Sequence, residues 1–162
     1  MRQKDIANLI ENRFGDWEMD LIVDQHQNAI LTLVERSTDF CLMHKIANKQ
    51  AKTVSKMVWR LLLPYKKKVL TITTDNGSEF AEHEWITKHI GAKVYFTDSF
   101  SSWQKGNIEN TNKLIRQYIP KDTDFRKISD GYLTSIQTKI NRRPREKLKF
   151  NTPKCCFFKN FT

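Results

Sequence analysis

The pattern of apolar and polar residues first predicts strands. Three segments rich in Val, Ile, Leu and Thr follow one another with only short polar turns between them, at residues 16–23, 29–35 and 40–46. Such spacing favours a three-stranded antiparallel meander. Residues 1–14, ahead of these segments, carry a short amphipathic pattern and are expected to form a lead-in segment.

From residue 51 the period changes to that of a helix. Apolar residues recur at intervals of three and four up to Pro64, where this helix should end. Short β-rich segments at 69–73 and 93–97 then alternate with further helical patterns. The expected later helices are 82–90, 107–119 and 131–142.

The order of these elements predicts the fold class. Strands that alternate with helices in the second half of the chain imply right-handed crossovers and parallel pairing there. We therefore expect an α/β fold with a mixed five-stranded sheet, three strands antiparallel and the later ones parallel, flanked by helices. This is the layout of the ribonuclease H-like fold. Residues 15–153 are expected to form this core and residues 154–162 a C-terminal tail.

The charge of the chain is strongly positive. Lys and Arg number 28 against 18 Asp and Glu, a net charge of +10, and residues 113–149 contribute much of this excess. Such a balance favours a polyanionic partner, because cations that meet phosphates release condensed counterions. Composition alone is equally compatible with a basic surface that binds nothing.

Cysteine usage and hydropathy exclude other classes. Three cysteines, Cys41, Cys155 and Cys156, cannot close a disulfide framework and show no zinc-binding spacing, which indicates a reduced, intracellular protein. The adjacent pair is expected to fill apolar space. No apolar signal stretch and no run of about 18 apolar residues is present, so no membrane partner is expected.

Two aspartates are the first candidates for chemistry. Asp20 lies within the apolar first strand, where a carboxylate is costly to bury unless it is paired or binds a metal. Asp75 directly follows the fourth strand, where mixed α/β sheets tend to place ligand sites. If those strands are neighbours, the two carboxylates face each other, and divalent cations would relieve their repulsion.

A third carboxylate, Glu109, begins the helix after a polar loop and can reach the same edge. Two cations roughly 3.5–4 Å apart could activate an attacking oxygen and stabilise a leaving oxygen in phosphodiester chemistry. Each residue also has a simpler explanation. Asp20 could be a solubility charge on an edge strand, Asp75 the first residue of an Asp-Asn-Gly turn, and Glu109 an ordinary first-turn carboxylate.

Four ordered motifs resemble the catalytic core of bacterial insertion-sequence transposases of the retroviral-integrase superfamily, in the subgroup with thirty-three residues between the second aspartate and the glutamate. The motifs are GDWEMDLI at 15–22, TDNGSEF at 74–80, SSWQKG through ENTN at 101–112, and NRRPR with a later Thr-Pro at 141–153. Ile108 stands where the family usually has asparagine. This apolar residue is expected to pack differently and to alter the approach of Glu109.

Carried over position by position, the resemblance implies that Asp20, Asp75 and Glu109 hold Mg²⁺ or Mn²⁺ in a two-metal site. It implies cleavage of DNA ends and transfer of a 3′-hydroxyl into target DNA by a homodimer or higher multimer. The expected location is the bacterial cytoplasm, at the nucleoid. Relatives carry N-terminal helix-turn-helix regions that this sequence lacks, so end recognition is expected to be missing or weak, in an excised domain or a shortened relative.

Helix geometry adds candidate DNA contacts beside the glutamate. Asn112, Lys113 and Arg116 follow Glu109 by three, four and seven residues and so share its face. Arg116 is the preferred contact, because a guanidinium offers a planar fork to phosphate. The alternative is a solvated helix face in which Lys113 pairs with Glu109.

Further DNA contacts are expected in the loop before this helix and after the last one. Trp103 either stacks on a splayed base or packs the loop down. The remaining expected contacts are Lys105, Arg142, Arg143 and Arg145. Two other functions stay open, namely a catalytically inactive DNA-binding remnant and a ribonuclease H-type nuclease that cleaves RNA–DNA hybrids.

Overall fold

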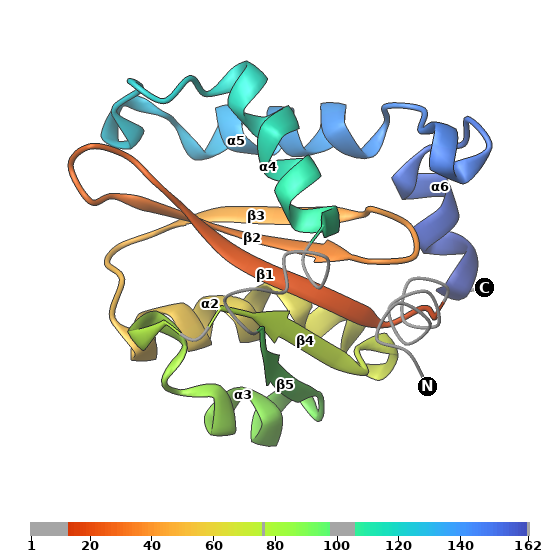
Figure 1. The fold of residues 1–162 in the computed structure, drawn as a ribbon, viewed down its shortest axis with the longest axis horizontal. Helices are drawn as coiled ribbons and strands as arrows, with labels where there is room; N and C mark the ends of the chain where they lie inside the picture. Colours follow the sequence, from red (N-terminus) through yellow and green to blue (C-terminus); the bar gives the residue numbers. More distant parts are fainter. Residues whose placement is uncertain (1–12, 76, 98–105, 162) are drawn as a thin grey trace.

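A single mixed sheet organises the chain, with strand order β3-β2-β1-β4-β5 (Figure 1). The computed structural model describes residues 13–75, 77–97 and 106–161. Strands β1, β2 and β3 form the antiparallel meander, whereas β4 pairs parallel with β1 and β5 pairs parallel with β4. The predicted mixed five-stranded sheet is confirmed. The strands are β1 Asp16–Val23, β2 Ala29–Glu35, β3 Cys41–Ile46, β4 Thr71–Thr74 and β5 Lys93–Phe96.

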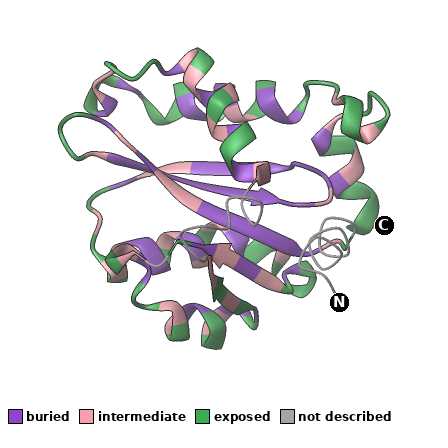
Figure 2. Cartoon of the chain, viewed as in Figure 1, coloured by how far each residue is buried: buried purple, intermediate pink, exposed green. Residues whose placement is uncertain are grey.

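Helices cover both faces of this sheet, and each face has its own apolar core. Helices α2 and α3 close one core, which contains Trp17 and Met19, and α4 and α5 close the other, which contains Ile22 and Ile30. Figure 2 shows the buried positions running along the central strands between these two helical layers. The helices are α2 Ala51–Leu62, α3 His83–Ile90, α4 Gly106–Tyr118, α5 Asp130–Asn141 and α6 Pro153–Phe158.

Short 3-10 helices lie in several of the described connections. As predicted, the amphipathic helix α2 ends just before Pro64, at Leu62, and the first 3-10 helix, η1 Leu63–Lys68, continues directly from it. Proline is tolerated there because it stands in the first turn, where its missing N–H has no helical partner. The others are η2 Ser78–Phe80, η4 Phe125–Lys127, η5 Glu146–Leu148 and η6 Lys159–Phe161. No helix in the described ranges is long and apolar enough to cross a membrane.

Gly15 sets the start of β1. Its φ of +103° lies in the left-handed region, and a Cβ at this position would meet the Lys68 carbonyl oxygen at 2.6 Å. The Gly15 carbonyl in turn accepts the N–H groups of Leu70 and Thr71. Only glycine allows this close approach, which fixes the register between β1 and β4.

The outer edge of β3 is closed by side chains of α5. Asn141 accepts a hydrogen bond from the Cys41 N–H through Oδ1 and donates one to the Cys41 carbonyl through Nδ2, both at 2.8 Å. Gln137 Oε1 accepts the Met43 N–H at 2.9 Å. These amides replace the backbone partners that another strand would supply, so the edge strand stays satisfied without one.

The C-terminal residues belong to the core, contrary to the expectation of a tail. Phe157 of α6 is fully buried, and its ring stacks on that of Phe40 with centroids 4.0 Å apart. The prediction that Cys155 and Cys156 fill apolar space is also wrong, because the first is exposed and the second half-exposed. The helix instead turns Phe157 inward, one position beyond this pair.

Truncation at Phe157 should therefore destabilise the whole domain. We expect Phe157→Ala to lower the free energy of unfolding by about 3–5 kcal/mol, because it removes a fully buried ring from a close-packed cluster. The neighbouring Phe158→Ala variant, at a residue that is 39% exposed, is the matched control and should cost much less. Urea unfolding followed by circular dichroism measures both, and equal losses would contradict this packing role.

Candidate active site

Strand β1 presents a row of carboxylates to α4. Successive side chains of a strand point to opposite faces. Trp17 and Met19 lie in the core under α2 and α3, so Glu18 and Asp20 face the other layer, where α4 lies over β1 and β2 (Figure 1). Asp20 is half-buried, whereas Glu18 is fully buried.

The strand register brings the two predicted aspartates to matching positions. Glu18 of β1 is the parallel partner of Thr73 of β4. Two residues further along each strand come Asp20 and Asp75, on the same face of the sheet. Asp75 directly follows β4, is exposed, and accepts a hydrogen bond from the Thr97 hydroxyl at 3.2 Å. The expected adjacency of the first and fourth strands is confirmed.

Glu109 stands exposed in the first turn of α4, and this turn is fastened to the sheet. The buried Glu18 carboxylate accepts the Ile108 N–H at 2.9 Å. The Asn107 amide donates to the Arg36 carbonyl at 2.9 Å and to Asp39 at 2.6 Å. Glu109 therefore lies between Asn107 and Ile108, which are hydrogen-bonded at the helix start, and Asn112, which is bonded one turn later.

That next turn touches Asp20 itself. Asn112 donates from Nδ2 to Asp20 Oδ2 at 3.2 Å, and its Oδ1 lies 3.3 Å from the Thr32 hydroxyl of β2. Glu109 precedes Asn112 by three residues and therefore shares its helix face. Ile108 is fully buried in the core between α4 and the sheet. Its apolar side chain therefore anchors the turn that carries Glu109.

The donor set fits a hard divalent cation, since carboxylate oxygens are what Mg²⁺ and Mn²⁺ prefer. Across the described ranges, however, no three His, Cys, Asp or Glu side chains are grouped closely enough to hold an ion. The structure therefore provides a pair of aspartates on the sheet and a glutamate on the adjoining helix. The assignment of all three as ligands stays a prediction.

Sequence reasoning missed the buried polar network behind this site. The Arg36 guanidinium lies 3.5 Å from Glu18, and both side chains are almost completely buried. Lys147 donates to the Arg36 carbonyl at 2.7 Å and to Asp39 at 3.2 Å. The available signal was the alternation of Asp16, Glu18 and Asp20 along one face of a single strand, which demands partners for every member.

Two of the predicted DNA contacts already have partners within the chain. Arg116 donates to the carbonyls of Val23 at 3.2 Å and Ile119 at 3.4 Å, and burial lowers the pKa of its guanidinium. Arg145 donates to the Ile140 carbonyl at 3.0 Å and lies 3.9 Å from Asp39. Both therefore hold structural roles that the sequence analysis missed, and their contact with DNA stays a prediction.

The other predicted DNA contacts differ in how far their side chains are exposed to solvent. Lys113, Arg142 and Arg143 are exposed, whereas Asn112 is half-buried against Asp20. Trp103 and Lys105 lie outside the described residues. A cavity of about 210 Å³ beside the first turn of α4 is lined by Asn107, Asn110 and Lys147 among others, and Glu109 is not part of its lining.

This sheet order, with aspartates at matching positions of two central strands, defines a ribonuclease H-like core. Residues 11–102 match the family described as the integrase core domain. The solved catalytic core domain of BIV integrase superposes with a TM-score of 0.72 at 19% identity, over 91% of this chain and 95% of that one, which shows the shared fold.

The chain belongs to the integrase core domain family. It is 43% identical over 145 residues to the transposase for insertion sequence element IS4351 of Bacteroides fragilis, covering 89% of this chain and 44% of that protein. It is 38% identical over 148 residues to the InsI transposase of an IS30 element of Escherichia coli, covering 90% and 39%. The chain thus spans less than half the length of these relatives, and the resemblance to insertion-sequence transposases is confirmed.

Asp24, directly after β1, supplies a pH-dependent test of the fold. Asp24 is buried, which opposes ionisation, but the N–H groups of Phe125, Asn28 and His26 lie 2.8–2.9 Å away and lower its pKa from 3.8 to about 2. Its folded-state pKa is below the ordinary value, so the charge stabilises the fold above about pH 4. That stabilisation is lost as the pH falls towards 2.

We therefore expect Asp24→Asn to unfold at lower urea than the wild type at pH 6, with the difference shrinking between pH 4 and 2. Urea midpoints measured across this pH series test the expectation. Asp122→Asn, at an exposed residue on the loop after α4, is the control and should show little difference. A gap between Asp24→Asn and wild type that stays constant over the series would contradict the assignment.

Proposed function

We propose that this chain is the catalytic core of a DNA transposase, a polynucleotidyl transferase that cleaves DNA ends and transfers a 3′-hydroxyl into target DNA. The observation that carries the proposal is the matched position of Asp20 in β1 and of Asp75 directly after the neighbouring parallel strand β4, with the start of α4 hydrogen-bonded to β1. The names of the transposase relatives and the integrase core domain match support it.

Asp20 and Asp75 would hold divalent metal ions, and Glu109 would complete the ligand set from α4. The ions would supply the activation of an attacking oxygen and the stabilisation of a leaving one. Asn112 would orient Asp20, because its amide donates to Oδ2 of the carboxylate while the Leu21 N–H donates to Oδ1. The hydrogen bonds from Ile108 to Glu18 and from Asn107 to Asp39 would keep Glu109 beside the two aspartates.

The approach to this site is suited to a phosphate backbone. Lys113 is exposed one turn after Glu109, and Lys147 lines the cavity beside the same helix start. Such cations position a duplex without reading its sequence. DNA ends and target DNA are therefore the proposed partners, bound by a dimer or higher multimer of the transposase.

A ribonuclease H-type nuclease could share this fold, but the transposase relatives favour DNA as the substrate. A catalytically inactive remnant would bind DNA without turnover. Comparing duplex DNA with an RNA–DNA hybrid, in the presence of Mn²⁺, separates these cases from the proposed function.

The decisive variant is Asp75→Ala. We expect the wild type to nick or join duplex DNA in Mn²⁺ and the variant to lose at least about a hundredfold in rate, because one metal ligand is gone while the exposed position spares the fold. The matched control, Glu84→Gln, removes an exposed carboxylate on α3 and should retain full activity. Indistinguishable nicking by the wild type and Asp75→Ala would reject the catalytic site.

Lys113 and Arg116 should separate DNA binding from stability. Arg116→Ala is expected to lower the free energy of unfolding by about 1–3 kcal/mol, because two carbonyls lose a charged donor. Lys113→Ala should leave the melting temperature unchanged and weaken duplex binding, with a shallower salt dependence. Thermal melts and fluorescence anisotropy measure the two effects, and a destabilised Lys113→Ala would refute the separation.

A further inference from the structure

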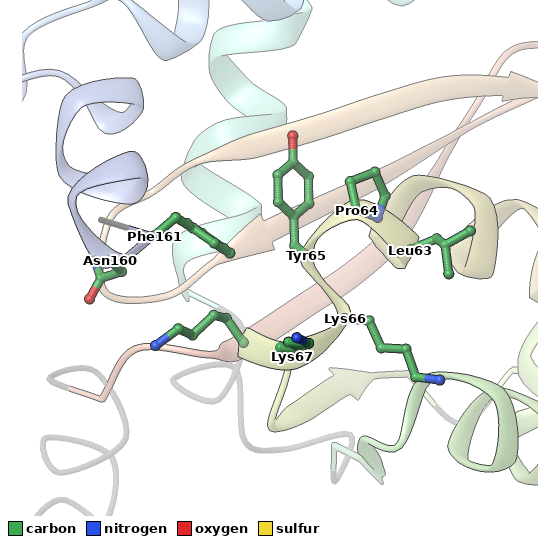
Figure 3. A pocket seen from close by; sticks show the side chains of 8 residues that line it. Leu63, Pro64, Tyr65, Lys66, Lys67, Asn160 and Phe161 are labelled. Atoms are coloured by element: carbon green, nitrogen blue, oxygen red, sulfur yellow. The ribbon is translucent and has the colours of Figure 1, made fainter.

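A basic cavity lies at the end of the sheet opposite the candidate active site. It has a volume of about 480 Å³ and is lined by η1, residues 63–68, together with Asn160 and Phe161. Figure 3 shows Phe161, near the C-terminus, extending toward the η1 residue Tyr65, with Asn160 beside it at the edge of the cavity. The cavity precedes β4, whereas Asp75 follows that strand, so it is distinct from the site described above.

Three adjacent lysines give this cavity its charge. Lys66, Lys67 and Lys68 are all exposed, and none of their ammonium groups bonds to another side chain in the described part of the chain. The described lining contains no carboxylate, whereas the cavity beside α4 includes Asp39 and a third cavity includes Asp130. Neighbouring cations without counter-charges repel one another, and an anionic ligand relieves that repulsion.

Apolar and aromatic residues of η1 and of the C-terminal segment also line the cavity. Leu63 is 44% exposed and Phe161 39% exposed, so both present large apolar surface to solvent. The Phe161 ring packs 5.7 Å from that of Tyr65, which in turn rests 5.1 Å from the buried Phe157. The exposed ring thus stands on a rigid aromatic base, the arrangement that proteins use to stack unpaired nucleobases.

We propose that this cavity, the η1 pocket, binds unpaired DNA, with backbone phosphates on Lys66–Lys68 and one base against Phe161. Lysines beside an aromatic platform suit a single strand, because the bases of a duplex stay stacked and cannot enter. The proposal deepens the proposed function and rests on it for the choice of DNA. Lys68 and Asp75 are seven positions apart, about 23 Å at the rise of a strand, which is the length of about seven nucleotides of one DNA strand.

The test measures binding of a fluorescent single-stranded oligothymidylate to the full chain over a salt series. The variant Lys66→Gln/Lys67→Gln/Lys68→Gln should bind at least about tenfold more weakly at 0.1 M salt, with the slope of log K against log salt reduced by about 2. The control Lys52→Gln/Lys56→Gln/Lys88→Gln removes the same charge from exposed positions of α2 and α3 and should change the slope far less. Equal slopes for the two triple variants would overturn the proposal.

A second pair of variants tests the base contact. Phe161→Ala should weaken binding of the single strand about fivefold or more and leave duplex binding unchanged. Phe158→Ala is the control, since that ring is equally exposed but does not line the cavity. Equal losses for single strand and duplex would refute the base contact. Circular dichroism melts verify that each variant is folded.

The same proteins distinguish this inference from the proposed function. Asp75→Ala should lose metal-dependent nicking and keep the salt dependence of single-strand binding seen in the wild type. The η1 triple variant should keep nicking at saturating DNA and show a reduced salt dependence of binding. If the wild type does not nick DNA but the η1 variant still binds single-stranded DNA more weakly than the wild type, the proposed function is wrong and the η1 pocket is supported as a DNA-binding site. If the η1 variant instead dissociates a dimer without changing DNA binding, the pocket is a protein interface and the proposal fails.

Discussion

The packing of α4 against β1 depends on a carboxylate that has no contact with solvent. Glu18 lies fully buried in the middle of the sheet, where it faces the Arg36 guanidinium and accepts the N–H of Ile108. A buried charge is costly unless it is paired and hydrogen-bonded, and removing one partner is more costly still. The helix start therefore has one favourable place relative to the strand, and Glu109 and Asn112 inherit their positions from it.

Other buried carboxylates around the sheet also need hydrogen-bond partners, and these bonds join segments that are far apart in the chain. Glu35 is completely buried, which raises its pKa, and it is kept in place by the N–H of Gly15 and the hydroxyls of Ser37 and Thr38. The Asp39 carboxylate accepts hydrogen bonds from Asn107 of α4 and from Lys147 of η5. The candidate site therefore rests on a polar framework beneath it, which an apolar core alone would not orient so specifically.

The sequence predicted the sheet well because strand and helix periods are local properties. Residues 16–23 and 29–35 were expected as strands and match β1 and β2, and the order of elements led to the parallel pairing of β1 with β4. The pairing of Asp20 with Asp75 followed from that topology. The partners of Arg116 and the burial of Phe157 could not be anticipated, because they depend on contacts between segments distant in sequence.

The amides of Asn141 and Gln137 determine how this sheet can meet other chains. An edge strand with unpaired backbone groups is a template on which a further strand can add, in assembly or in aggregation. At Cys41 and Met43 that template is already occupied by side chains of the same molecule. A strand of another chain could pair with this edge only by displacing these amides from Cys41 and Met43, so the α5 side chains protect β3 from sheet extension at these positions.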